Sequence, residues 1–268
     1  MKYSTLLFVA ILALGFAAAP AQDWAKARLE KSPRHPEWVN VKHGDREVNC
    51  FITYPEVKDK ATAVIVIHEI FGLSDWARSV TDQLAEAGYI AIAPDLLSGT
   101  APGGGGTAEL IKSGAEVGQA IRKLPLDQIT ADLSAVADYV AKLPSCNGKV
   151  AVAGFCWGGS QTFRFATNSK KIKAAFAFYG SGPEKADDIA RIECPVYGFY
   201  GGNDNRVNAT IPQSTELMKK AGKLYEPVTY DGAGHGFMRA GEAPDANDAN
   251  KKAREQAWKR WKELLAKF

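Results

Sequence analysis

The chain has 268 residues, of which 46% are hydrophobic and 24% are charged, and its formal net charge at pH 7 is +3. This composition is typical of a globular α/β domain with a substantial apolar core. The near-neutral balance excludes the strongly basic surface of a nucleic-acid-binding protein, so we expect no nucleic-acid partner. The four cysteines form no CxxC pair, which excludes the spacing of a zinc finger or a thioredoxin-like site.

The beginning of the chain indicates an export signal. Lys2 is followed by an apolar run at residues 6–19, and small residues at positions 19 and 21 precede Gln22. This pattern predicts a secretory signal peptide, residues 1–21, cleaved before Gln22. The alternative is a membrane anchor, for which the run is short. We therefore expect an exported protein, periplasmic or secreted, with no stable membrane insertion after cleavage.

The mature part, residues 22–268, begins with strand formers at 38–41 and 48–54 around a turn, which predicts a leading antiparallel hairpin. Apolar strands then alternate with helical patterns. Strands are predicted at 63–68, 89–93, 150–153, 174–179, 196–200 and 226–230, and helices at 76–87, 126–143, after 159, at 214–221 and at 251–268. Such alternation predicts an α/β fold with a mostly parallel sheet and helices on both faces. Active sites in these sheets lie at the carboxyl ends of the strands.

The stretch GFCWGG, residues 154–159, follows the strand at 150–153 and precedes a helical pattern. This is the strand–turn–helix context of a nucleophile elbow, in which flanking glycines permit a strained turn that presents the middle side chain. Cys156 occupies that middle position, between Gly154 and Gly158. A buried, inert cysteine is the alternative, since free cysteine often acts as a small apolar residue.

A nucleophile needs a base and a group that orients the base. Asp204 follows the strand at 196–200, and His235 lies in a glycine-rich loop after the strand ending near residue 230. Cys156, Asp204 and His235 thus stand in the order nucleophile, acid, histidine that α/β hydrolases use. Ser160 is a rival nucleophile, but it lies inside the start of the helix.

The sequence resembles the dienelactone hydrolase family over nearly the whole mature chain. The matching segments are HEIFGL at 68–73, LAEAGY at 84–89, APDL at 93–96, GFCWGG at 154–159, Asp204 with Val207, and Gly234 with His235. The resemblance implies a single catalytic domain of the α/β-hydrolase fold at residues 22–268. It also implies hydrolysis of small esters or lactones through a cysteine nucleophile and a thioester, with no metal and no cofactor.

By the matching positions, Cys156, Asp204 and His235 would form the triad. Glu69 would be the carboxylate that contacts the resting thiol and releases it when substrate arrives. The backbone N–H groups of Trp157 and Ile70 would form the oxyanion hole. We predict a structural role for His68, because strand alternation directs its side chain away from that of Glu69.

Substrate charge is where the sequence departs from the family. By the resemblance, Arg239 matches an arginine that binds the substrate carboxylate in dienelactone-cleaving members of the family. Those members have a second arginine where this sequence has Gly99, and a tyrosine where it has Leu97. The site for an anionic group is therefore half complete. The sequence predicts the activity class but leaves the natural substrate open, dienelactone included.

Two other functions remain possible from the sequence. One is a non-catalytic or thiol-redox protein on the same scaffold, with Cys156 paired or oxidisable. The other is a serine-like esterase or peptidase of broader substrate range, although the short segment between Tyr179 and Val196 leaves little room for a lid domain. Pairing among Cys50, Cys146 and Cys194 is undetermined. We expect a monomer whose partner is a small-molecule ester or lactone.

Overall fold

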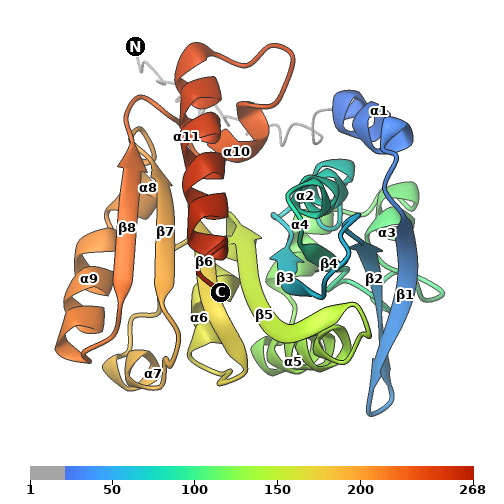
Figure 1. Cartoon of the computed structure of the whole chain (residues 1–268), viewed down its shortest axis with the longest axis horizontal. Helices are drawn as coiled ribbons and strands as arrows, with labels where there is room; N and C mark the ends of the chain where they lie inside the picture. Colours follow the sequence, from blue (N-terminus) through green and yellow to red (C-terminus); the bar gives the residue numbers. More distant parts are fainter. Residues whose placement is uncertain (1–21) are drawn as a thin grey trace, which may run out of the picture.

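The computed structural model describes residues 22–268, which are built around one eight-stranded sheet (Figure 1). The predicted signal peptide, residues 1–21, lies outside the described residues. Within the described part of the chain, no helix combines the length and the apolar character needed to cross a membrane.

The strands run in the order β1-β2-β4-β3-β5-β6-β7-β8. Their bounds are β1 Pro36–His43, β2 Arg46–Thr53, β3 Ala61–Ile67, β4 Ile90–Pro94, β5 Cys146–Phe155, β6 Ile172–Phe178, β7 Val196–Gly201 and β8 Tyr225–Tyr230. β1 pairs antiparallel with β2, and β2 antiparallel with β4, whereas every pair from β4 to β8 is parallel. The predicted leading hairpin and mostly parallel sheet are confirmed.

The helices cover the two faces of this sheet. Their bounds are α1 Asp23–Lys31, α2 Asp75–Glu86, α3 Thr107–Lys112, α4 Val117–Arg122, α5 Leu126–Ala141, α6 Trp157–Ala166, α7 Ala186–Ala190, α8 Asn205–Asn208, α9 Ile211–Lys220, α10 Phe237–Ala240 and α11 Asp248–Leu265. In Figure 1, α11 lies along the sheet near β7 and β6, and the β1–β2 hairpin forms the edge opposite β8.

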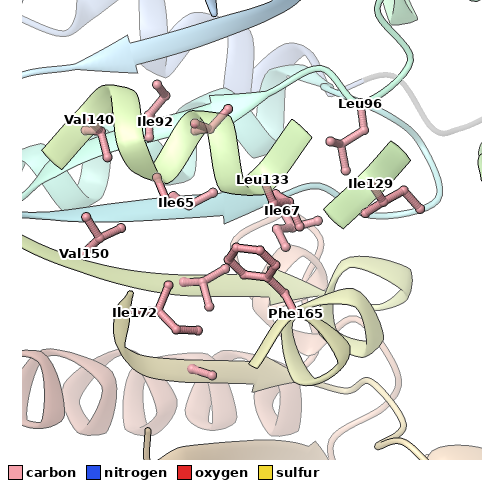
Figure 2. Close-up of a cluster of buried hydrophobic side chains, with 14 of the residues drawn as sticks. Ile65, Ile67, Ile92, Leu96, Ile129, Leu133, Val140, Val150, Phe165 and Ile172 are labelled. Atoms are coloured by element: carbon pink, nitrogen blue, oxygen red, sulfur yellow. The ribbon is translucent and has the colours of Figure 1, made fainter. Parts of the chain in front are cut away.

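Alternate residues of β3 divide the core into two layers. Ile65 and Ile67 belong to a buried cluster that includes side chains of α5 and α6, seen in Figure 2, whereas Val64 and Val66 belong to a second cluster with α2 and α11. Every residue of β3 is buried. A strand covered on both faces in this way reads as a continuous apolar run, which explains why β3 was predictable from its sequence.

Six helices, α1, α3, α4, α7, α8 and α10, were not predicted, and all of them except α1 have six residues or fewer. α1 has only Ala25 as a buried residue, so it lacks the repeated apolar positions by which an amphipathic helix is recognised. α3 and α4 have six residues each, too few to establish a helical period.

Candidate active site

Cys156 sits in a strained turn between β5 and α6. Its backbone angles are φ 56° and ψ −116°, and it is one of two non-glycine residues with positive φ in the described chain. Such a conformation is costly for an L-residue and persists only where its surroundings enforce it. Here β5 ends at the preceding residue and α6 begins at the following one. The turn is therefore a nucleophile elbow in geometry as well as in sequence.

Glycines allow the elbow to pack against its neighbours. A Cβ on Gly154 would lie 2.2 Å from the carbonyl oxygen of Gly158, and a Cβ on Gly158 would lie 2.4 Å from that of Ile67. Real Cβ atoms do not approach backbone so closely, so a side chain at Gly154 would push α6 away from β5, and one at Gly158 would push it away from β3. The glycines thus hold the first turn of α6 against the ends of β5 and β3.

The three predicted triad side chains lie together at the carboxyl ends of β5, β7 and β8. Nε2 of His235 is 3.1 Å from Sγ of Cys156, and its Nδ1 is 2.5 Å from Oδ2 of Asp204. Because a carboxylate only accepts, Nδ1–H donates to Asp204, which leaves Nε2 free to accept the thiol proton. Asp204 is 6% exposed, and its Oδ1 accepts the N–H of Val207 at the start of α8.

The electrostatics around Sγ keep the thiol protonated at rest. Burial, followed by the negative charge of Glu69, raises the pKa of Cys156 to about 11. Hydrogen bonds from the backbone N–H groups of Trp157 and Ile70, together with the positive charge of Arg206, act in the opposite direction on this pKa. The two predicted oxyanion donors therefore both face the sulfur. Arg206 was not identified from the sequence.

Glu69 is buried beside the triad, but its hydrogen bonds are to other residues. Its Oε2 accepts from Nε of Arg239 at 2.7 Å, and its Oε1 accepts from the hydroxyl of Tyr179 at 3.4 Å. The expected direct contact with the resting thiol is thus replaced by an ion pair with Arg239, while Cys156 contacts His235. The carboxylate still acts on the thiol through its charge.

Tyr179 is a member of this network that the sequence analysis did not identify. It follows β6 directly, has φ 39°, and is 1% exposed. Its ring meets that of His235 edge to face at 5.2 Å. Burial, followed by the charge of Glu69, raises the pKa of its phenol well above the usual value, so the hydroxyl remains a donor to Glu69. Its position after a strand that ends beside the elbow was the signal that could have revealed it.

Arg239 is already engaged in an ion pair in this structure, through Nε. Its guanidinium pairs with Glu69 and lies over the ring of Phe71, 5.0 Å from the centroid. At the position of the missing second arginine, Gly99 has Arg46 nearby, but that guanidinium bonds the buried carboxylate of Asp132. The site for an anionic group therefore contains Arg239, paired with Glu69 through Nε, and no second arginine at position 99.

The structure also shows the state of the other cysteines and of Ser160, the rival nucleophile. All four cysteines of the chain lie in its described part and are free, and Cys50, Cys146 and Cys194 are buried. The hydroxyl of Ser160 accepts from the backbone N–H of Ser181 at 2.9 Å, and across residues 22–268 it bonds no histidine. Over the same residues, no group of three histidine, cysteine or acidic side chains is placed to hold a metal ion.

Comparisons with known proteins agree with this geometry. A sequence model of the dienelactone hydrolase family matches residues 48–268. The chain is 31% identical over 234 residues to a Salmonella typhimurium protein provisionally named carboxymethylenebutenolidase, covering 83% of each chain, and 31% identical over 216 residues to one from Escherichia coli, covering 76% of each. A crystal structure from Klebsiella pneumoniae, provisionally described as a dienelactone hydrolase, superposes with a TM-score of 0.73 at 24% identity, over 88% of this chain and 99% of that one.

Proposed function

The chain belongs to the dienelactone hydrolase family and is a hydrolase of esters or lactones, and we propose that it works through Cys156, His235 and Asp204 and acts outside the cytoplasm. The observation that carries this proposal is the unbroken line of contacts from Sγ of Cys156 through the imidazole to Asp204, 3.1 Å and 2.5 Å long. A nucleophile, a base and a group that orients the base are the parts that covalent acyl transfer requires.

In the first half of the reaction, Sγ attacks the carbonyl carbon of the ester or lactone while its proton passes to Nε2 of His235. The carbonyl oxygen becomes an oxyanion, which the backbone N–H groups of Ile70 and Trp157 stabilise. The intermediate then collapses with cleavage of the C–O bond, and the imidazolium returns the proton to the leaving alkoxide. Asp204 holds the ring in the tautomer that makes both transfers possible. The product is a thioester on Cys156.

In the second half, water attacks the thioester carbonyl and gives a proton to Nε2 of His235. The C–S bond breaks, the proton returns to sulfur, and the carboxylic acid leaves. For a lactone, alcohol and acid are parts of one molecule, so a single hydroxy acid is released. Every atom of this cycle comes from substrate, water and the chain.

The high pKa of the thiol explains why the base must act during the attack. At a pKa of about 11, little thiolate exists at neutral pH, so the free enzyme is protected from alkylation and oxidation. We infer that Glu69 restrains the thiol through its charge and that a substrate which draws the Glu69 carboxylate away from the thiol releases that restraint. This replaces the direct contact expected from the sequence.

Substrate size and charge follow from the same residues. The relatives' name, carboxymethylenebutenolidase, supports a small lactone as the substrate class. However, Arg239 is held by Glu69, and the position of a second arginine is Gly99. Neutral esters or lactones are therefore expected to be turned over about as well as dienelactone. Export, by signal cleavage before Gln22, completes the proposal.

The test compares Cys156→Ala with Ser160→Ala, a matched control at the rival nucleophile one helical turn away. Each protein is assayed with aryl esters, simple lactones and dienelactone, and thermal unfolding is recorded for each. Cys156→Ala is expected to lose about three or more powers of ten in kcat, with little change in Tm, whereas Ser160→Ala retains the wild-type rate. The opposite result would assign the chemistry to Ser160, and full activity in both variants would refute a nucleophile on this elbow.

A further inference from the structure

His68, the first residue after β3, is completely buried, and a hydrogen bond from one of its ring nitrogens indicates its tautomer. Its Nδ1 lies 2.8 Å from the backbone carbonyl oxygen of Glu69. Since a carbonyl only accepts, Nδ1 carries the hydrogen, and the neutral ring has a bare Nε2. Across residues 22–268 that Nε2 has no hydrogen-bond partner. A buried polar atom left without a partner is costly, so the contacts that His68 does make, through Nδ1 and through the face of its ring, are the ones to consider for its role.

The carbonyl that His68 binds belongs to the same peptide unit as the N–H of Ile70. Because a peptide unit is planar, fixing the oxygen at one end fixes the direction of the hydrogen at the other. That N–H faces Sγ of Cys156, where it lowers the pKa of the thiol. The Glu69 carbonyl also accepts from Gly72 N–H at 3.1 Å, so two donors hold this peptide in an otherwise irregular loop.

The ring of His68 also contacts the second oxyanion donor. It stacks on Trp157, with centroids 5.5 Å apart and planes inclined by 15°. The N–H of Trp157 has independent support, because α6 begins at this residue and Gly158 packs closely against the carbonyl oxygens of Ile67 and His68. Ile70 lies outside any helix or strand. The direction of the Ile70 N–H therefore depends on His68 more than that of the Trp157 N–H does, and the hydrogen bond to the Glu69–Ile70 peptide is the more important of the two contacts of His68.

We propose that His68 is a positioning residue that directs the Ile70 N–H at the oxyanion by hydrogen bonding to the far end of the same peptide, an inference that rests on the proposed cysteine mechanism. A donor on the carbonyl also polarises the peptide and strengthens its N–H as a donor. Both effects act on the transition state, in which negative charge develops on the substrate oxygen, more than on bound substrate.

Two substitutions separate the hydrogen bond from the stacked ring. His68→Asn retains a donor, because its Nδ2 is attached like Nδ1 of histidine, but it removes the ring. His68→Phe retains a ring that can stack on Trp157 but removes the donor. We expect His68→Phe to lower kcat about tenfold with KM changed less than about twofold, a fraction of the effect of deleting an oxyanion donor. His68→Asn is expected to restore kcat to within about threefold of wild type.

A second readout does not depend on turnover. The rate of alkylation of Cys156 by iodoacetamide is followed against pH, and the apparent thiol pKa is expected to rise in His68→Phe relative to wild type and His68→Asn. If His68→Phe fails to fold, His68→Leu replaces it as the variant without a donor. Equal kcat and equal thiol pKa in all folded variants would overturn the role of His68, as would a loss in His68→Asn equal to that in His68→Phe. Failure of the proposed mechanism is distinguishable, because Cys156→Ala would then remain active.

Discussion

Removing Arg239 is expected to destabilise the fold through the carboxylate that it leaves behind. The side chain of Glu69 is 4% exposed and that of Arg239 is 21% exposed, so Arg239→Ala would leave a buried negative charge whose remaining side-chain donor among residues 22–268 is the Tyr179 hydroxyl. Breaking a buried ion pair costs about 3–5 kcal/mol. We expect about 3 kcal/mol, the lower end, because water reaches the arginine side of the pair. For a chain of this size, that corresponds to a fall in Tm of about 6–12 °C.

A double-mutant cycle isolates this contribution. The free energy of unfolding is measured by urea titration with tryptophan fluorescence for wild type, Arg239→Ala, Glu69→Gln and the double variant. Since a neutral glutamine needs no cationic partner, Arg239→Ala in the Glu69→Gln background is expected to cost less than about 1 kcal/mol. Equal costs of Arg239→Ala in both backgrounds would show that Arg239 stabilises the fold by packing on Phe71 rather than by pairing with Glu69.

Further predictions concern the thiol, the elbow and the beginning of the mature chain. Glu69→Gln removes a negative charge that raises the pKa of the Cys156 thiol, so this pKa is expected to fall. The thiolate fraction at pH 8 then rises, and iodoacetamide is expected to alkylate Cys156 faster. An unchanged alkylation rate would return Glu69 to a purely structural role. Gly158→Ala places a Cβ 2.4 Å from a β3 carbonyl oxygen and is expected to lower the free energy of unfolding by about 1–3 kcal/mol and to remove most of the activity. Gly44→Asn, in a turn with open space around it, serves as a tolerated control in the same unfolding assay. Mass spectrometry of the exported protein is expected to show Gln22 as its first residue, and an uncleaved chain in a membrane fraction would contradict the signal peptide.

The sequence predicted the parts of the fold and site that depend on local pattern. β3 and the second half of β5 are apolar runs followed by glycine-rich or charged turns, and the nearby glycines made the elbow at Cys156 recognisable. Because parallel strands bring their carboxyl ends to one edge, the loops after β7 and β8 were expected beside it. The contacts of Asp204 and His235 therefore followed from strand order.

Contacts between side chains distant in sequence could not be predicted in this way. Glu69 and Arg239 are 170 positions apart, and only the packed structure reveals that they pair with one another. Strand alternation directed the His68 side chain away from that of Glu69, but this pattern could not reveal the hydrogen bond from its ring to the Glu69 backbone carbonyl, which lies beyond the end of β3. Tyr179 was missed because its strain and burial are properties of the fold.

The most direct test of the cysteine mechanism is to trap the acyl-enzyme. The mature protein is mixed with an activated aryl acetate, quenched in acid during turnover, digested and analysed by mass spectrometry. The mechanism predicts one acetyl group, carried as a thioester on Cys156 and removed by hydroxylamine, with none in Cys156→Ala. Turnover accompanied by an acetyl group on Ser160, or by none on any residue, would contradict it.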